Sequence, residues 1–239
     1  MKKILNLTLL CLMMSTSNIA RAVEKNVDMS FQCEKIVIEE NKKDINMESI
    51  KGEIKTPTIT APNNNFTKDI NQKLKDWNDS WLKDLEDLAQ KYAQDSKEDN
   101  IPFRPFEVDS VYSIQNQKCP YLSFYIDYYQ FTGGAHGITT RKTYNYNLND
   151  DKELALKDLF KEGYNYKDII NKEIGNQIQK NKENYFTDKN GFKGISDNQA
   201  FTFNDKEITI YFQQYEIAPY VTGIPTFNIP KSLLKNGLI

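Results

Sequence analysis

The sequence of 239 residues contains a single histidine, His136. A mononuclear zinc or non-haem iron site built on two or three histidines is therefore excluded within this chain. A Ser-His-acid triad would have to use His136, and nothing in the sequence places a serine beside it. Two roles for His136 stay open: a general base, or a side chain whose hydrogen bond holds a turn in place.

Motifs that mark common enzyme classes are also missing. The sequence has no Walker-type G-x-x-x-x-G-K-[ST] and no G-x-G-x-x-G, and we expect no cofactor. No G-x-S-x-G nucleophile elbow occurs, because residues 194–198 lack the final glycine. The 33 acidic residues are compatible with a two-carboxylate glycosidase, but no pair of them is marked out. Glu216 lies among apolar and aromatic neighbours, where a carboxylate is either hydrogen-bonded or functional.

Cysteine is scarce, with three residues in all. Cys11 lies in an apolar N-terminal run, which leaves Cys33 and Cys119. Two cysteines in an exported chain predict one disulfide, which would close 119 − 33 = 86 residues. Two buried free thiols are the alternative. Two cysteines with one histidine make a poor zinc ligand set.

Long apolar runs are confined to the N-terminus. A short basic stretch at residues 1–3 precedes the mostly apolar residues 4–14, and Ala20-Arg21-Ala22 fits a small-x-small cleavage site. Residues 1–22 are therefore predicted to be a secretory signal peptide, too short to span a membrane. No later stretch reaches a transmembrane length. We therefore expect a mature chain from Val23 without a membrane anchor, located in the periplasm or outside the cell.

The predicted mature chain is acidic. Cleavage removes three basic residues and no acidic one, which leaves 31 − 3 = 28 Lys and Arg against 33 Asp and Glu, a net charge of −5. This balance argues against nucleic acid and permits a basic partner. Ordinary solubility charge is the alternative interpretation.

The N-terminal half contains strand patterns on both sides of one long helix. Residues 30–39 and 50–59 predict strands, and Pro57 puts the second at an edge or a strand end. A helix is predicted to begin at residue 66 and to end near residues 96–100, from an apolar stripe over residues 66–92 with spacings of three and four. The stripe consists of Phe66, Ile70, Leu74, Trp77, Trp81, Leu85, Leu88 and Tyr92. We expect it, with both tryptophans, to pack against a sheet.

Residues 121–148 contain the clearest alternating pattern. Residues 121–129 alternate apolar and polar side chains, and residues 138–148 continue in the same way. Between them lies T-G-G-A-H-G, with the only Gly-Gly pair of the chain, Gly133-Gly134. We therefore predict an antiparallel hairpin connected by this loop. A further strand is predicted before it, over residues 108–115.

The C-terminal half predicts a second helix and a second sheet. A helix capped by Asn165 is expected to end near residues 181–184, followed by a hairpin of residues 200–203 and 207–213. Residues 215–225 contain two prolines and a glycine and are predicted to be a structured loop. A strand over 226–229 and a helical turn over 231–234 follow. The predicted fold is α+β, with mainly antiparallel sheets and two long amphipathic helices.

Two motifs together carry a family resemblance. Residues 129–137 read Y-Q-F-T-G-G-A-H-G, and residues 215–223 read Y-E-I-A-P-Y-V-T-G. With L-A-L-K-D-L-F at residues 154–160 between them, they resemble a paired module of exported bacterial proteins. This module is the non-catalytic N-terminal part of PdaC-type peptidoglycan deacetylases and the extracellular, lysozyme-sensing part of RsiV-type anti-sigma factors. The resemblance implies two joined subdomains, PdaC-like over residues 23–135 and RsiV-like over residues 136–239.

The resemblance also implies a function. No deacetylase domain and no sigma-binding segment is recognisable in the sequence, so a binding module for lysozyme or peptidoglycan is expected, without catalysis. The two motif loops are its expected contact elements, through Phe131, Gly133, Gly134, His136, Gly137, Tyr215, Glu216, Pro219 and Tyr220. Two alternatives stay open. One is a weak esterase or glycan hydrolase that uses His136 or Glu216, and the other is a structural envelope protein.

Overall fold

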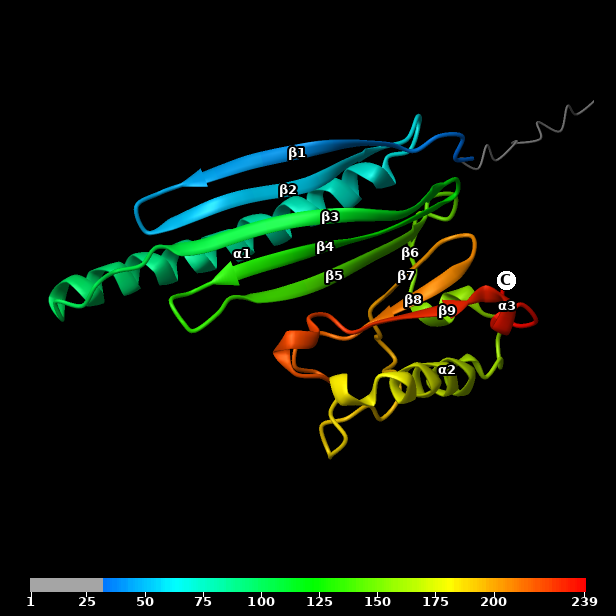
Figure 1. Ribbon diagram of the computed structural model, residues 1–239. Helices are drawn as coiled ribbons and strands as arrows, with labels where there is room; N and C mark the ends of the chain where they lie inside the picture. The colour runs from blue at the N-terminus through cyan, green and yellow to red at the C-terminus, as the bar shows by residue number, and fades with distance from the viewer. Residues whose placement is uncertain (1–31) are drawn as a thin grey trace, which may run out of the picture. The chain divides into compact units, whose positions relative to one another are not determined.

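Six strands form the larger of two sheets, in the order in which they occur along the chain. The computed structural model describes residues 32–239 (Figure 1), so the predicted signal peptide at residues 1–22 lies outside the described residues. The strands are β1 (Val37–Asn46), β2 (Ile50–Thr60), β3 (Phe106–Lys118), β4 (Tyr121–Phe131), β5 (Ile138–Asn147) and β6 (Lys152–Glu153). All neighbours are antiparallel except β2 and β3, which the intervening helix makes parallel.

Strand β1 differs from its predicted position. The sequence predicts a strand over residues 30–39, whereas β1 begins at Val37 and ends at Asn46. It pairs only with β2 and forms one edge of the sheet, and Ile45 is its only buried side chain. An exposed edge strand needs no alternation of apolar and polar residues, so its pattern gave no signal.

Helix α1 (Phe66–Glu98) covers one face of this sheet (Figure 1). Ile70, Leu74 and Leu85 are buried, as the stripe predicts. Trp77 packs on the Tyr128 ring of β4, with centroids 6.1 Å apart, although it is 37% exposed. The prediction is wrong for Leu88, which is 49% exposed. Leu82 and Ala89 are buried instead. The buried face turns around the helix axis because the sheet beneath a helix of 33 residues twists.

The smaller sheet contains β7 (Phe201–Phe203), β8 (Glu207–Tyr211) and β9 (Thr226–Pro230), all antiparallel. Helix α2 (Tyr166–Lys180) packs on it through Ile170 and Ile174, and Asn165 caps the helix as predicted. The short helix α3 (Lys231–Leu234) and the 3-10 turns η1 (Leu156–Leu159), η2 (Lys182–Asn184) and η3 (Tyr220–Thr222) complete the fold. The predicted α+β class is confirmed.

A buried polar network joins the two sheets. The hydroxyl of Ser123 on β4 donates to Asn145 Oδ1 on β5 at 2.7 Å and accepts from the Phe203 amide on β7 at 3.0 Å. Asn145 Nδ2 donates to the Phe201 carbonyl oxygen at 2.8 Å. Phe31–Ile239 is one compact unit. The subdomain boundary at residues 135/136 stays a prediction.

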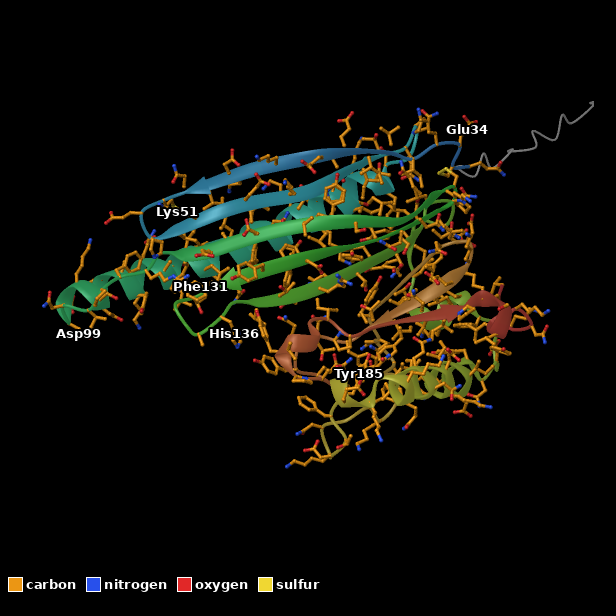
Figure 2. All side chains as sticks on the ribbon, viewed as in Figure 1. Glu34, Lys51, Asp99, Phe131, His136 and Tyr185 are labelled. Atoms are coloured by element: carbon orange, nitrogen blue, oxygen red, sulfur yellow. A yellow bond between two sulfur atoms is a disulfide. The ribbon has the colours of Figure 1, made fainter. Side chains whose placement is uncertain are left out.

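The predicted disulfide is present, with a Cα–Cα separation of 5.3 Å between Cys33 and Cys119. It ties the segment before β1 to the connection between β3 and β4. Figure 2 shows Glu34, next to Cys33, at one end of the sheet, and Phe131 and His136 at the other. The disulfide is therefore remote from the first motif loop.

Candidate functional site

The β4–β5 hairpin holds the first motif loop at the end of the sheet. Alternate side chains of β4 from Leu122 to Tyr128 are buried beneath α1, and cross-strand pairing continues to Gln130 opposite Ile138. Phe131 closes β4 and is 3% exposed, with the Arg104 guanidinium 4.2 Å above its ring. Phe131 therefore anchors the loop, and the residues after it carry the exposed surface.

The two glycines of the Gly-Gly pair have different environments. Gly133 has a φ of +89°, which side-chain-bearing residues rarely adopt, and a Cβ there would lie 3.4 Å from the Tyr92 ring. A Cβ on Gly134 would meet only the His136 carbonyl oxygen, at 4.0 Å. Gly137 is buried against the ring of Tyr129. Gly133 is therefore required by the turn, whereas Gly134 leaves the loop surface open.

The two glycines should respond differently to substitution. We expect Gly133→Ala to destabilise the fold by about 1–2 kcal/mol, because the positive φ strains an L-residue. Gly134→Ala should stay within about 0.5 kcal/mol of the parent. Urea unfolding followed by far-UV circular dichroism measures both. Equal losses for the two variants would contradict this assignment.

Two glutamines fasten the second motif loop to the first hairpin. The main-chain amides of Thr139 and Arg141 on β5 donate to Gln214 Oε1 at 2.7 Å and to Gln213 Oε1 at 3.0 Å. Gln213 Nε2 donates to the Arg141 carbonyl oxygen at 2.8 Å. These side chains occupy main-chain groups that an edge strand would otherwise leave unpaired. The sequence analysis missed them, and no local pattern marks them.

The second motif loop turns sharply at its start. Tyr215 has a φ of +67°, and the next residue, Glu216, accepts a hydrogen bond from the Gln213 amide at 2.7 Å through Oε2. Glu216 is exposed and stabilises the turn. Pro219, half-buried, precedes η3, which carries Tyr220 and Val221.

The structure brings the two motifs into contact through three aromatic side chains, His136, Tyr215 and Tyr220, which we name the aromatic junction. The rings of His136 and Tyr220 stack with centroids 3.9 Å apart and an interplanar angle of 20°. The Tyr215 hydroxyl lies 3.1 Å from His136 Nε2, and the Tyr215 and Tyr220 rings are 5.8 Å apart. Figure 2 places His136 in the loop between β4 and β5.

The aromatic junction lies on the surface. Tyr215 is 47% exposed, and Val221, at the tip of η3, is 90% exposed. Burial raises the pKa of the neighbouring Tyr129 hydroxyl, so Tyr129 stays neutral at physiological pH. The junction therefore presents apolar and hydrogen-bonding groups with little formal charge.

A charged pair supports the hairpin next to the aromatic junction. Arg141 Nε and Nη2 donate to the Asp127 carboxylate at 2.7 and 2.6 Å, while the guanidinium lies 3.7 Å from the Tyr125 ring centroid. Tyr211 on β8 contacts the same guanidinium at 4.7 Å. Burial lowers the pKa of Arg141, but the hydrogen bonds to Asp127, the charge of Asp127 and the neighbouring Tyr125 and Tyr211 together outweigh it, so the net pKa is raised. This group holds β5 against the smaller sheet.

The chemistry available to His136 is limited by its contacts. Its Nδ1 lies 2.9 Å from the Gly137 carbonyl oxygen and its Nε2 faces the Tyr215 hydroxyl. Within residues 32–239, no serine or carboxylate is hydrogen-bonded to the ring. Nor does that part of the chain bring three His, Cys, Asp or Glu side chains together for a metal ion. The arrangement suits recognition through aromatic surface.

Two family models match the chain, the first over most of the larger sheet and the second over the smaller sheet. Residues 40–139 match the model described as "Deacetylase PdaC", and residues 157–232 match the "Protein of unknown function (DUF3298)". Two curated relatives come from Bacillus subtilis strain 168. The peptidoglycan-N-acetylmuramic acid deacetylase PdaC is 28% identical over 160 residues, and the anti-sigma-V factor RsiV is 26% identical over 210 residues. The predicted resemblance is confirmed.

The chain matches only part of these relatives. The match covers 65% of this chain and 32% of the deacetylase, and 78% of this chain and 65% of the anti-sigma factor. A crystal structure of a DUF3298 family member from Bacteroides fragilis has a TM-score of 0.65 at 21% identity, covering 86% of this chain and 93% of that one. A crystal structure of a DUF3298 family protein from Pseudomonas aeruginosa has a TM-score of 0.56 at 18% identity, covering 85% of this chain and 94% of that one.

The similarity to RsiV and to the DUF3298 model supports an extracellular binding or sensing module at the level of the family, and the two crystal structures support the fold. Helices long and apolar enough to cross a membrane are absent from residues 32–239.

Proposed function

We propose that this chain, which carries a PdaC-like and a DUF3298-like region in tandem, is a secreted or periplasmic, non-catalytic binding module for a lysozyme-like protein. The aromatic junction is its contact surface. One observation carries the proposal: loops separated by about 80 residues meet in an exposed aromatic cluster through the stacked rings of His136 and Tyr220.

The composition of the aromatic junction supports a protein partner. Tyrosine and histidine supply large contact area with few rotatable bonds, and aromatic residues are enriched at interface cores. The mutual stacking of the three rings holds them before binding, which lowers the entropic cost of association. The glutamine bonds to β5 keep the loop that carries Tyr215 and Tyr220 in register with the one that carries His136.

Charge supports a cationic partner. The predicted mature chain carries a net charge of 28 − 33 = −5. Opposite net charges raise the association rate, and salt reduces that contribution. Binding of a cationic lysozyme is therefore expected to weaken, without vanishing, when salt is raised, because the aromatic contacts are insensitive to screening.

The test is calorimetric titration of residues 23–239 with a c-type lysozyme at two salt concentrations. We expect one-to-one binding and a loss of about 30- to 1000-fold on Tyr220→Ala, the range of a central aromatic anchor. The matched control is Tyr121→Ala, which should bind lysozyme like the parent. Tyr121 is also a partly exposed tyrosine, but it lies at the opposite end of β4. Absence of binding at both salt concentrations would reject the proposal.

Peptidoglycan is the second candidate ligand, because one curated relative is named as a deacetylase of its N-acetylmuramic acid. Co-sedimentation with insoluble peptidoglycan distinguishes the two. If peptidoglycan is the ligand, the chain sediments with it, and Tyr220→Ala remains in the supernatant. A hydrolase activity would instead be lost in His136→Ala or Glu216→Gln when ester and glycan substrates are screened.

A further inference from the structure

The outer edge of β5 is occupied along most of its length. Gln214 and Gln213 take the main-chain groups of Thr139 and Arg141, and the Leu154 amide donates to the Asn145 carbonyl oxygen at 2.8 Å. Strand β6 then pairs opposite Tyr146 and Asn147. Outward-facing groups recur at every second residue of an antiparallel edge strand, so Thr143 also directs its amide and carbonyl outward.

Thr143 is the exception along this edge. Within residues 32–239, its outward amide and carbonyl have no hydrogen-bond partner. A gap one residue wide therefore interrupts the occupied edge, between the glutamine side chains on one side and Leu154 on the other. A main-chain amide and carbonyl exposed side by side match the complementary pair of one residue in an extended peptide.

Two hollows open on the two sides of this gap. One, of ≈ 440 Å³, lies between α1 and β5 and is lined by Trp77, Lys142 and Tyr144. The other, of ≈ 490 Å³, lies between β5 and residues 154–158 and 197–201. Thr143 lines both. Successive side chains of a peptide paired with Thr143 would alternate between these two hollows.

The hollow beside α1 contains one ammonium group without an ion pair among the described residues, that of Lys142, and is also lined by Asp76 and Glu153. Lys142 Nζ lies 3.1 Å from the centroid of the Trp77 ring and forms no ion pair within residues 32–239, while the nearby Lys73 pairs with Glu153 at 2.5 Å. Burial and the charge of Lys73 lower the pKa of Lys142 more than the charge of Glu153 raises it, and a further anion would raise it again. Beneath the hollow, the buried Tyr144 hydroxyl has no hydrogen-bond partner within residues 32–239.

We propose that the gap at Thr143 binds a short acidic peptide in extended conformation, with its main chain paired to Thr143 and a carboxylate beside Lys142. This site is separate from the aromatic junction and does not depend on the proposed function. A residue directly opposite Thr143 shares its face, so its neighbours in the peptide point to the α1 side. With an acidic residue on each side of the paired residue, one carboxylate faces Lys142 whichever way the peptide runs.

The probe is the tripeptide N-acetyl-Glu-Ala-Glu-amide, with N-acetyl-Gln-Ala-Gln-amide as its uncharged match. Titration into ¹⁵N-labelled residues 23–239 should produce saturable shifts at the amides of residues 142–144 and at the Trp77 indole. We expect the glutamine peptide to bind at least tenfold more weakly. Shifts confined to other residues, or no saturation at millimolar peptide, would overturn the proposal.

Two variants separate the roles of the main chain and the ammonium group. Thr143→Pro removes an amide that bonds no other strand, so the fold should survive and binding should be lost. Lys142→Met should remove the preference for glutamate over glutamine. Lys231→Met is the matched control, because its ammonium is also partly buried over an aromatic ring, that of Phe203 at 5.3 Å.

The controls also distinguish this site from the aromatic junction. Tyr220→Ala should bind the peptide like the parent, and Thr143→Pro should bind lysozyme like the parent. Far-UV circular dichroism and the thermal midpoint establish that each variant is folded. Unchanged peptide affinity in folded Thr143→Pro and folded Lys142→Met would reject the site.

Discussion

Replacement of Gly52 by alanine is expected to destabilise the fold by roughly 3–5 kcal/mol, the sum of overpacking and backbone strain. Gly52 lies near the start of β2, opposite Ile45 on β1 and Val108 on β3. A Cβ at this position would lie 1.6 Å from the Val108 carbonyl oxygen, and the φ of Gly52 is +151°.

The atoms that a Cβ on Gly52 would meet belong to the main chain of Val108, so they cannot move away by a change of side-chain rotamer. Val108 is fully buried, and its strand is fixed between β2 and β4. Relief would require β2 and β3 to separate at their parallel pairing, which extends only from Ile50 to Ile54 on β2. The substitution is therefore expected to weaken the hydrogen bonds that join the β1–β2 hairpin to the rest of the sheet.

Urea unfolding followed by tryptophan fluorescence and circular dichroism measures this effect. Gly175→Ala is the control, because a Cβ in the middle of α2 would meet nothing within 4 Å. That variant should be more stable than the parent by about 0.5–1 kcal/mol, from helix propensity. A Gly52→Ala variant as stable as the parent would show that β2 and β3 do not pair in this register.

The second large effect is expected from the disulfide. The double variant Cys33→Ala/Cys119→Ala should lose about 4 kcal/mol of unfolding free energy, because the bond closes 86 residues and restricts the unfolded chain. The bond also holds the segment that precedes β1, and β1 is supported by β2 alone. Loss of the bond should therefore loosen this edge of the sheet first.

Unfolding of the parent with and without dithiothreitol checks this expectation. Dithiothreitol should lower the unfolding free energy of the parent to that of the double variant. It should leave the unfolding free energy of the double variant unchanged. Hydrogen exchange should show the largest gain in the amides of β1 and β2. If the reduced parent unfolds at the same urea concentration as the oxidised protein, the bond does not contribute to stability.

Several elements of this protein were predictable from local sequence. The alternation of residues 121–129 and 138–148 predicted the β4–β5 hairpin, and Asn165 with the following apolar residues predicted the start of α2. The β7–β8 hairpin and the loop of residues 215–225 were likewise predicted. Each depends on interactions between residues close in the chain, such as helical periodicity, pleat alternation, capping and turn geometry.

The buried face of α1 and the bounds of β1 were predicted less accurately. The stripe on α1 predicted that Leu88 packs against the sheet, but the twist of the sheet turned the buried face towards Leu82 and Ala89. The edge strand β1 gave no alternation, because most of its side chains face solvent. The parallel pairing of β2 with β3 follows from where α1 returns the chain, which a local window does not contain.

The residue sequence by itself determined the elements, the cysteine pair and the two motifs that carry the family resemblance. Only the tertiary structure decided that the motifs meet. The contact of His136 with Tyr220 requires the smaller sheet to pack beside β5, and Gln213 and Gln214 hold it there through main-chain bonds that leave no sequence pattern. The gap at Thr143 arises in the same way, because an unpaired amide is defined by what packs around it.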